Sequence, residues 1–247
     1  MIFLLAPAFN ESENLEYLVR TVYKKVPFKY RLIIVNDGST DNTLEVAQKI
    51  SAKYNLKIIG YKKNQGPGYA FKYGFDYILK LAKDADLIVT IESDNSSDLN
   101  SLKEMIAKSR NHDVVVASPI MIKNGLVGIK AHRKFLTYAN HYITHFFFHI
   151  KGINSYGNFF RVYKPSIIRK QKKVYGSNYI TEHGFTVATE ILIKLDKIGA
   201  TFTSVPSKVD WSNRVGQSKM IIFKYIRSQI LFIMKYWLLS AYFLKTK

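Results

Sequence analysis

Three carboxylates gather in the stretch Thr90–Leu99, TIESDNSSDL, although the chain as a whole is strongly basic. Glu92, Asp94 and Asp98 follow a run of Ile, Val and Leu that predicts a buried strand. Glu92 and Asp94 are two residues apart, so an extended backbone would point both side chains to the same side. Hard cations such as Mg²⁺ and Mn²⁺ prefer carboxylate oxygens. The pair therefore predicts a divalent-cation site at the end of this strand.

The overall charge bounds the partners of the chain without choosing one. Its 247 residues include 37 Lys and Arg against 18 Asp and Glu, a formal net charge of +19. Such an excess favours a polyanion, which could be an anionic membrane, a phosphorylated ligand or nucleic acid. A lysine-rich composition also arises in AT-rich genomes, so charge alone selects none of these. The absence of cysteine excludes disulfides, thiol nucleophiles and zinc–thiolate sites.

The first half of the chain alternates short apolar runs with helical patterns. Helices are expected near residues 12–25, 42–54, 68–83 and 99–109, between the runs FLLAPAF, RLIIVND, LKIIGY, DLIVTIES and DVVVAS. The opening MIFLLAPAFNE is expected to be the first buried strand rather than a signal peptide. Near-continuous Ile, Val and Leu strands separated by helices predict an α/β fold. Its mostly parallel sheet would be covered by helices on both faces.

Polar clusters follow four successive strands of this predicted sheet: PAFNE, NDGSTD, NQGPGYA and ESDNSSD. Any one of them could be an ordinary capped loop, because Asn10, Asp41 and Asp98 are good helix N-caps. Ligands of parallel α/β sheets bind beyond the carboxyl ends of the strands. Four clusters at four strand ends therefore predict a binding site at one edge of the sheet.

The second half holds two long aromatic and basic segments, at about residues 126–150 and 220–244. The tail 228–244 carries one charge, Lys235, and its length of about 25 Å as a helix falls short of a hydrocarbon core of about 30 Å. We expect both helices to lie in a membrane interface. Two core helices of a soluble protein and a dimer interface are the alternatives. The expected organisation is a domain over 1–219, with the helix at 126–150 inserted, and an amphipathic helix over 220–247.

These motifs, in this order, resemble family 2 glycosyltransferases of the GT-A (Rossmann-like) fold, and above all the polyprenyl-phosphate branch that includes dolichyl-phosphate mannose synthase. The resemblance covers about residues 1–220. It rests on PAFNE, VNDGSTD, the spaced glycines of Asn64-x-Gly66-x-Gly68-x-Ala70-x-x-x-Gly74, the acidic cluster and RVGQSK from Arg214. It implies an inverting transfer of a hexose from a nucleotide-diphospho-sugar of the GDP-mannose or UDP-glucose type.

The resemblance also implies roles for the strand-end residues. Eight of them are expected to bind the nucleotide sugar: Pro7, Phe9, Glu11, Val35, Asp37, Gly66, Glu92 and Ser93. Mg²⁺ or Mn²⁺ would neutralise the departing diphosphate. Asp94 is expected as its direct ligand, with Glu92 as a ligand or ribose contact and Ser96 as a weaker one. The family usually has Asp-x-Asp here and a Gln two residues beyond, so Glu92 and Ser96 are departures.

The expected acceptor is a polyprenyl (dolichyl or undecaprenyl) phosphate. A phosphate monoester is already anionic at pH 7, with a second pKa near about 6, so it needs cations to hold it rather than a base. By the resemblance these are Arg133 with Thr137, and Arg214 with Lys219. Asp94, Arg133, Arg214 and Lys219 are the expected catalytic residues. Pro119 stands where the branch commonly has an Arg, and Arg161 is kept without the turn glycine that usually precedes it.

Three functions remain open at this stage. The first is transfer to a polyprenyl phosphate at the cytoplasmic face of the cell membrane by a peripheral protein that binds no nucleic acid, with homo-oligomerisation left open. The second is transfer to a hydroxyl acceptor in cell-surface glycan synthesis, with Glu182 or His183 as the base. The third is a non-catalytic basic protein that binds membranes or nucleic acid. His141, His145 and His149 share one helix face and are expected to be core or interface residues rather than metal ligands.

Overall fold

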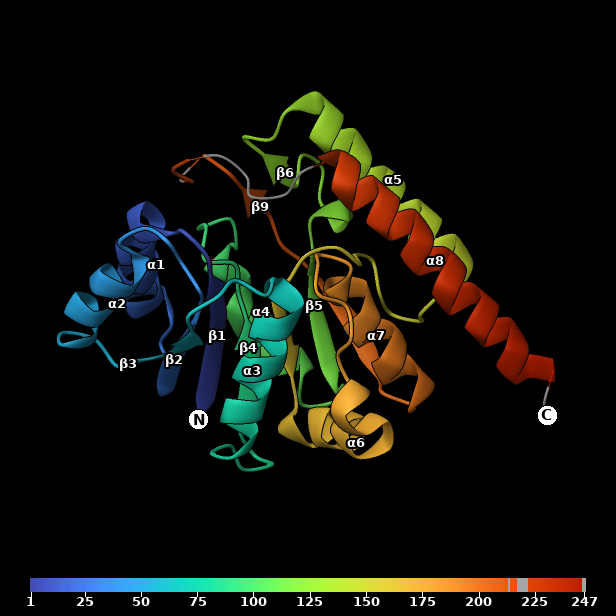
Figure 1. Cartoon of the computed structure of the whole chain (residues 1–247), viewed down its shortest axis with the longest axis horizontal. Helices are drawn as coiled ribbons and strands as arrows, with labels where there is room; N and C mark the ends of the chain where they lie inside the picture. Colours follow the sequence, from blue (N-terminus) through green and yellow to red (C-terminus); the bar gives the residue numbers. More distant parts are fainter. Residues whose placement is uncertain (213, 217–221, 246–247) are drawn as a thin grey trace.

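A seven-stranded sheet forms the centre of the molecule (Figure 1). The computed structural model describes residues 1–212, 214–216 and 222–245, with the backbone alone over 239–245. The strand order is β3-β2-β1-β4-β7-β5-β8. The strands are β1 (Ile2–Ala8), β2 (Tyr30–Asp37), β3 (Leu56–Tyr61), β4 (Leu87–Thr90), β5 (Val114–Ser118), β7 (Arg161–Tyr163) and β8 (Phe202–Pro206). Only β7 is antiparallel to its neighbours in this sheet, so the predicted mostly parallel α/β sheet is confirmed.

Helices cover both faces of the sheet, as the sequence predicts. One face carries α1 (Ser12–Lys25), α2 (Thr43–Ser51) and α4 (Leu102–Lys108), the last preceded by the 3-10 turn η1 (Leu99–Ser101). The other face carries α3 (Pro67–Leu79), α6 (Pro165–Tyr175) and α7 (Val187–Lys197). Two further 3-10 turns, η2 (Pro119–Met121) and η3 (Gly176–Asn178), lie in connections.

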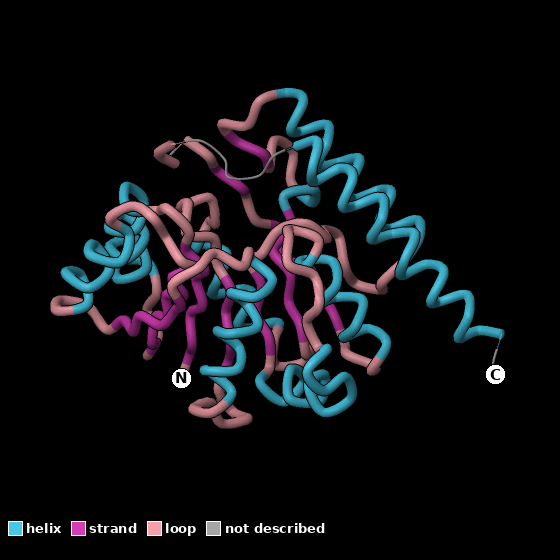
Figure 2. Tube along the Cα trace, viewed as in Figure 1, coloured by secondary structure: helices cyan, strands magenta, loops and turns pink. Residues whose placement is uncertain are grey.

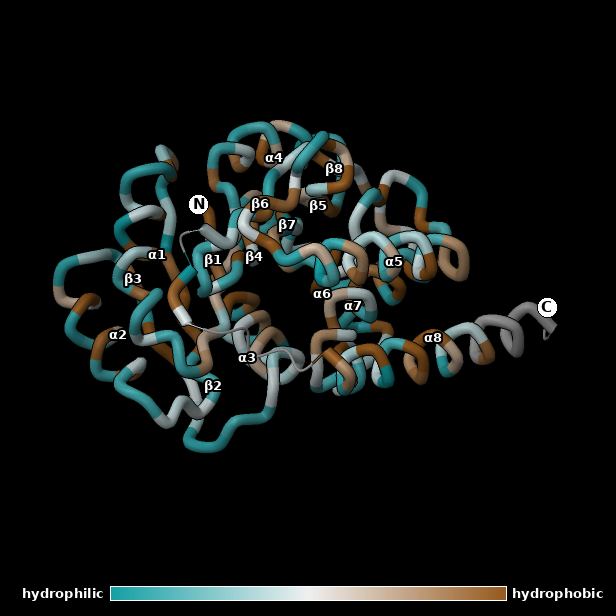
Figure 3. The backbone as a smooth tube through the Cα atoms, turned by 90° about the horizontal axis from the view of Figure 1, so that it is seen from above, coloured by the Kyte–Doolittle hydropathy of each residue, from teal (hydrophilic) through white to brown (hydrophobic). Residues whose placement is uncertain are grey.

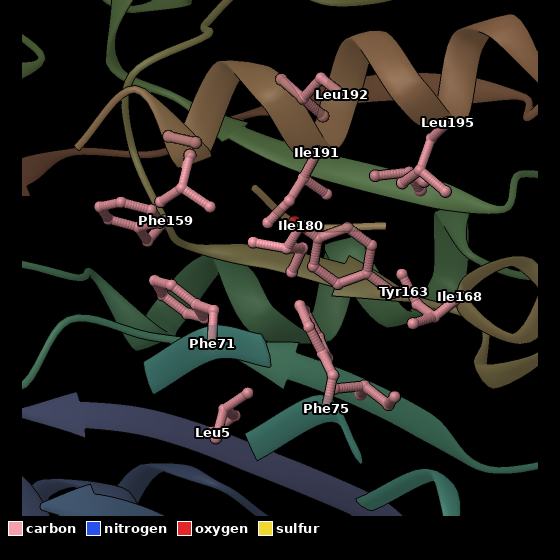
Figure 4. Close-up of a cluster of buried hydrophobic side chains, with 14 of the residues drawn as sticks. Leu5, Phe71, Phe75, Phe159, Tyr163, Ile168, Ile180, Ile191, Leu192 and Leu195 are labelled. Carbon is pink, nitrogen blue, oxygen red and sulfur yellow. The ribbon is translucent and has the colours of Figure 1, made fainter. Parts of the chain in front are cut away.

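The two hydrophobic cores follow the alternation of side chains along each strand. In β1, Phe3 and Leu5 pack on the α3 and α7 side, whereas Leu4 and Ala6 pack on the α1 and α2 side. Figure 4 shows the first of these cores, where aromatic rings of α3 meet aliphatic side chains of α7. A strand with both faces buried needs apolar residues throughout, which explains why the strands appear as continuous apolar runs in the sequence.

The loops that follow the strands gather at one edge of the sheet, the upper edge in Figure 2. There a small sheet of β6 (Leu126–Val127) and β9 (Val209–Asp210) lies over the loop after β4. Ser97 bridges to Val209, and the Asp210 N–H donates to the Ser96 carbonyl at 3.0 Å. The segment after β9 is thereby held above the carboxyl ends of the strands, next to the acidic cluster.

Helices α5 (Ala131–Phe148) and α8 (Ile222–Lys245) run side by side in the same direction (Figures 1 and 3). The Phe148 and Phe232 rings lie 6.3 Å apart, and Phe232 and Ile233 are buried in the core beside α7. The exposed surface of the pair is rich in large apolar side chains, among which the charged Lys224, Arg227 and Lys235 are also exposed. We call it the α5/α8 apolar face; its exposed apolar side chains are Phe135, Tyr142, Ile143, Phe146, Phe147, Phe223, Ile226, Ile230, Leu231, Met234, Trp237 and Leu238.

Candidate active site

The loops after β1 and β2 interlock at the carboxyl edge of the sheet. Asn10 has a left-handed backbone (φ 55°), and its side-chain oxygen accepts from the Thr40 N–H at 2.8 Å. The Glu11 N–H donates to the Thr43 hydroxyl at 2.8 Å. The clusters PAFNE and NDGSTD thus form one polar wall, as their positions at neighbouring strand ends predict.

Asp37, at the end of β2, organises the third polar cluster. Its carboxylate accepts from the Asn64 side-chain amide at 2.9 Å and from the N–H groups of Gln65 and Gly66 at 2.8 and 3.0 Å. Asp37 is buried, and its charge raises the pKa of the Tyr61 hydroxyl in addition to the larger effect of burial. Asp37 therefore fixes the loop at 64–66, so the two expected nucleotide-binding residues Asp37 and Gly66 are in direct contact.

Gly66 and Gly68 allow a close approach of backbone, but the approaching backbone is the chain's own segment 182–183. Gly66 has φ 88°, and a Cβ there would lie 2.5 Å from the His183 carbonyl oxygen. A Cβ on Gly68 would lie 1.7 Å from the Glu182 carbonyl oxygen. The Gly68 N–H donates to the His183 carbonyl at 3.0 Å. Both positions require glycine for this contact, which links the donor-side loop to the start of the α7 region.

Beyond β4 the chain turns, which corrects the expected geometry of Glu92 and Asp94. The strand ends at Thr90, residues 93–94 form a turn, and Asn95 has φ 64°. The two carboxylates therefore do not project together from an extended backbone. Ser93 donates its hydroxyl to the Pro7 carbonyl at 2.6 Å, which ties this turn to the end of β1.

The Glu92 carboxylate is turned toward Phe159 and Ser97 and not toward Asp94. One of its carboxylate oxygens accepts from the Phe159 N–H at 2.8 Å, and the other accepts from the Ser97 hydroxyl. Burial raises its pKa, an effect to which the charge of Asp94 adds. Each oxygen thus accepts one hydrogen bond from the protein, which leaves one lone pair on each for another ligand.

Asp94 forms an ion pair with Arg214, with 2.7 Å between the Asp94 Oδ2 and a guanidinium nitrogen. Its other oxygen accepts from the Ser96 hydroxyl at 2.5 Å. The guanidinium carbons of Arg214 and Arg133 lie 5.1 and 5.2 Å from the centre of the Trp211 ring. Burial, with the nearby Arg214 charge, lowers the pKa of Arg133. The structure thus brings together three expected site residues, Asp94, Arg133 and Arg214, around one tryptophan.

The remaining expected residues are placed less directly. Thr137 donates its hydroxyl to the Arg133 carbonyl at 3.0 Å, one helical turn earlier in α5. Phe9 is half-buried just beyond β1. Val35 is fully buried in the core on the α3 side, so its side chain does not line the edge as expected. Lys219 lies outside the described residues.

Two residues of the site were missed in the sequence. Asn14, buried in α1, donates to a Glu11 carboxylate oxygen at 2.7 Å and pairs with the Val215 backbone at 2.8 and 3.0 Å. Trp211 holds the two arginines together. The available signals were the amide within NESEN and a tryptophan three residues before Arg214.

The donor set at Asp94 suits a hard cation only in the company of a diphosphate. Among the described residues no three His, Cys, Asp or Glu side chains cluster as a metal site. Asp94, with the Ser96 hydroxyl beside it, offers oxygen donors of the kind Mg²⁺ and Mn²⁺ take. Phosphate oxygens would complete the coordination, as in sites where one or two carboxylates share the ion with a substrate.

A separate cavity of about 250 Å³ lies on the α1 side of the acidic loop. Its lining includes Tyr17, Lys25, Glu92, Asn95 and Lys208. Asp37, Asp94 and Gly66 are not among its lining residues. The cavity therefore shares Glu92 and Ser96 with the acidic cluster but does not reach Asp94 or the loop held by Asp37.

Comparison with known proteins gives a family match and several relatives. The model described as glycosyl transferase family 2 matches residues 4–174. A dolichyl-phosphate beta-glucosyltransferase of Trichomonas vaginalis is 28% identical over 55% of this chain and 40% of its own length. A dolichol-phosphate mannosyltransferase of Pyrococcus furiosus is 28% identical over 51% and 35%. A dodecaprenyl-phosphate galacturonate synthase of Rhizobium johnstonii is 29% identical over 68% and 49%. The matched regions span about a third to a half of these relatives.

Solved structures share the fold at low identity. Glucosyl-3-phosphoglycerate synthase from Mycobacterium tuberculosis, in complex with Mn²⁺, UDP and glucosyl-3-phosphoglycerate, has a TM-score of 0.63 and 14% identity, over 97% of this chain and 79% of that one. S. aureus TarS in complex with UDP has a TM-score of 0.55 and 17% identity, over 84% and 58%. At these identities the likeness concerns the arrangement of the sheet and helices.

Proposed function

Because the chain belongs to glycosyl transferase family 2 and has the GT-A fold, we propose that it moves a hexose from a nucleotide-diphospho-sugar to a polyprenyl phosphate at a membrane surface. The relatives named for dolichyl- or dodecaprenyl-phosphate support this acceptor class. The donor would be of the GDP-mannose or UDP-glucose type, and the transfer would invert the anomeric centre.

The observation that carries the proposal is the array of Asp94, Arg214, Trp211 and Arg133. Asp94, a carboxylate suited to a cation bound to a diphosphate, forms an ion pair with Arg214. Arg133 lies against the same Trp211 ring as Arg214, and the two guanidinium groups are suited to bind a phosphate. Arg214 balances the charge of Asp94 in the donor-free protein. Trp211 keeps the two like-charged guanidiniums in place, because a cation over an aromatic face is stabilised.

On the donor side the polar wall of the sheet edge would take the nucleoside. The Glu11 carboxylate, beside Asn14, and the loop 64–66, held by Asp37, would line this side at the starts of α1 and α3. A bound Mg²⁺ or Mn²⁺ would supply charge neutralisation for the departing diphosphate. Asp94 would hold that ion, with Ser96 beside it.

On the acceptor side Arg133 and Arg214 would hold the phosphate, which needs no base because it is already ionised. The hydroxyl-acceptor alternative needs a base at Glu182 or His183. The Glu182 carboxylate accepts from Thr186 at 2.8 Å and pairs with Lys235 at 3.1 Å. Both carboxylate oxygens of Glu182 are therefore engaged within the protein, which gives the phosphate acceptor the better support.

The α5/α8 apolar face would seat the protein on the bilayer next to Arg133. Within the described parts of the chain, no helix is both long enough and apolar enough to cross a membrane. Helices with exposed aromatic residues and lysines are suited to lie in the interface. We expect a peripheral protein at the cytoplasmic face of the cell membrane.

The test is transfer to matched lipid acceptors. Vesicles with polyprenyl phosphate or the parent polyprenol are incubated with the protein, labelled GDP-mannose or UDP-glucose, and Mg²⁺ or Mn²⁺. We expect label in the lipid extract only with the phosphorylated acceptor and a suitable donor. Label in polyprenol would instead establish hydroxyl transfer, and label in neither lipid with any donor would refute both.

A further inference from the structure

Glu190 of α7 is a fully buried carboxylate that neither the donor side nor the acceptor side uses. Its oxygens accept from the Thr181 N–H at 2.9 Å and the Glu182 N–H at 2.9 Å. Lys194, one helical turn later, pairs with it at 2.6 Å. A buried charge is tolerated only with such a complete set of partners. Two of its partners belong to the backbone of segment 181–183, which therefore has one fixed course.

The C-terminal helix completes this set. Tyr236 of α8 donates its hydroxyl to Glu190 at 2.9 Å, and the neighbouring Lys235 pairs with Glu182 at 3.1 Å. Burial, together with the charge of Glu190, raises the pKa of Tyr236, so its hydroxyl keeps its proton and remains a donor. Two consecutive residues of α8 thus contact the two acidic residues that bracket the turn into α7.

Segment 181–183 in turn presses on the donor-side loop. The Glu182 and His183 carbonyl oxygens lie where side chains on Gly68 and Gly66 would be, and the His183 carbonyl accepts from Gly68 at 3.0 Å. The Gly66 N–H donates to Asp37 at 3.0 Å. A chain of direct contacts therefore runs from Tyr236 through Glu190 to segment 181–183, and from that segment through loop 66–68 to Asp37.

We propose that Glu190 and Tyr236 are positioning residues for the nucleotide loop: through segment 181–183 they fix residues 64–68, so that α8 is part of the donor-site scaffold. The inference rests on the proposed function in that it takes loop 64–68 to bind the nucleotide. It gives α8 two tasks, since the same helix carries the outward-facing apolar residues and the inward-facing Tyr236.

The first test compares Tyr236→Phe with Tyr175→Phe. Tyr175 lies in α6 and donates its hydroxyl to the Lys194 carbonyl at 3.5 Å, so the same atom is removed from the other side of α7. Affinity for UDP and for GDP is measured by titration calorimetry with Mn²⁺, in detergent-free buffer. We expect Tyr236→Phe to weaken binding about fivefold to tenfold, the scale of one ordinary hydrogen bond, because the effect reaches the nucleotide indirectly, while Tyr175→Phe leaves it within twofold.

The second test needs no ligand. Amide hydrogen exchange is measured by mass spectrometry on the full chain and both variants. We expect Tyr236→Phe to accelerate exchange in 181–184 and also in 64–68, whereas Tyr175→Phe leaves 64–68 unchanged. Acceleration confined to α8 and α7 would overturn the inference, as would equal nucleotide affinity in both variants. If the wild-type protein binds neither nucleotide but exchange spreads to 64–68, the positioning is upheld and the proposed function fails.

Discussion

At the scale of single residues, Asp94 is the group on which the proposed donor chemistry depends. It is paired with Arg214 and Ser96, whereas Glu92 is committed to Phe159 and Ser97. One carboxylate, rather than the expected pair, is therefore directed toward the array of arginines. In the proposed mechanism a cation at this site would find little negative charge on the protein, so diphosphate oxygens would have to complete its coordination.

Asp94→Asn should slow sugar transfer about a hundredfold to a thousandfold, the scale of a removed electrostatic contact to a developing charge. The amide keeps the size of the side chain but not its charge. The check is the initial rate of label transfer to lipid at saturating Mn²⁺. Asp98→Asn is the matched control, because Asp98 caps η1 through its bond to the Asn100 N–H and Asn can do the same. Equal rates in both variants would contradict the role of Asp94.

Asp94 was expected from its place at a strand end, whereas Arg133 and Arg214 were expected only from the family resemblance; the structure places the three close together. The sequence did not predict how Glu92 turns, since that depends on Phe159, which is 67 residues away. Trp211 was missed for a similar reason. An aromatic ring between two arginines has no characteristic spacing when the arginines come from distant segments.

At the scale of elements, α7 is stabilised by a buried ion pair that depends on pH. Burial opposes ionisation of Glu190, but Lys194 and the donors around it outweigh this effect and lower its pKa. A lowered pKa means that the folded state favours the carboxylate. The stabilisation is present above the unfolded pKa of about 4.3 and is lost as the pH falls through the folded pKa.

Glu190→Gln should lower the free energy of unfolding by about 3 kcal/mol at pH 7, because it leaves Lys194 buried without its counter-charge. The difference from wild type should shrink as the pH falls below about 4.5. Urea unfolding between pH 3.5 and 7 measures it. Glu16→Gln, which removes an exposed pair with Arg20, should cost under about 1 kcal/mol. A pH-independent difference for Glu190→Gln would show that the carboxylate charge is not what stabilises α7.

The elements of the first half were predictable, and those between α5 and α8 were not. Helix α1 has the expected bounds, 12–25, because its buried residues recur at helical spacing. Helix α7 is buried from Val187 through Leu195, so no polar face marks it. Strand β7 contains Arg161, which argues against a central strand. Its two terminal guanidinium nitrogens donate to the carbonyls of Ala188 and Tyr156 at 2.6 and 2.8 Å, which offsets the cost of burying the charge.

At the scale of the whole molecule, the α5/α8 apolar face and the array around Trp211 meet at the start of α5. Arg133 lies in the first turn of that helix, and Phe135, Phe146 and Phe223 extend the exposed apolar surface from it. The geometry suits an acceptor whose tail stays in lipid while its phosphate reaches Arg133.

Replacing Phe146 and Phe223 together by Ser should weaken binding to vesicles that contain anionic lipid. Their exposed fractions are 82% and 81%, and burying a Phe side chain contributes about 1.5–3 kcal/mol, so a loss of at least tenfold is expected. Co-sedimentation measures the partition. Tyr23→Ser on α1, which is 66% exposed, is the control and should bind as wild type. If the double variant and the control bind equally, this face does not meet the membrane.

Two-substrate kinetics of Arg133→Gln test the account most directly, because they separate the acceptor side of the array from its donor side. Initial rates are measured over a grid of nucleotide-sugar and polyprenyl-phosphate concentrations, with Lys134→Gln as a control for loss of surface charge. We predict that Arg133→Gln raises the KM for polyprenyl phosphate at least about tenfold, the scale of a lost charge-assisted bond, and leaves the donor KM within twofold. An unchanged acceptor KM, or an equal effect in Lys134→Gln, would contradict the assignment of Arg133 to the acceptor phosphate.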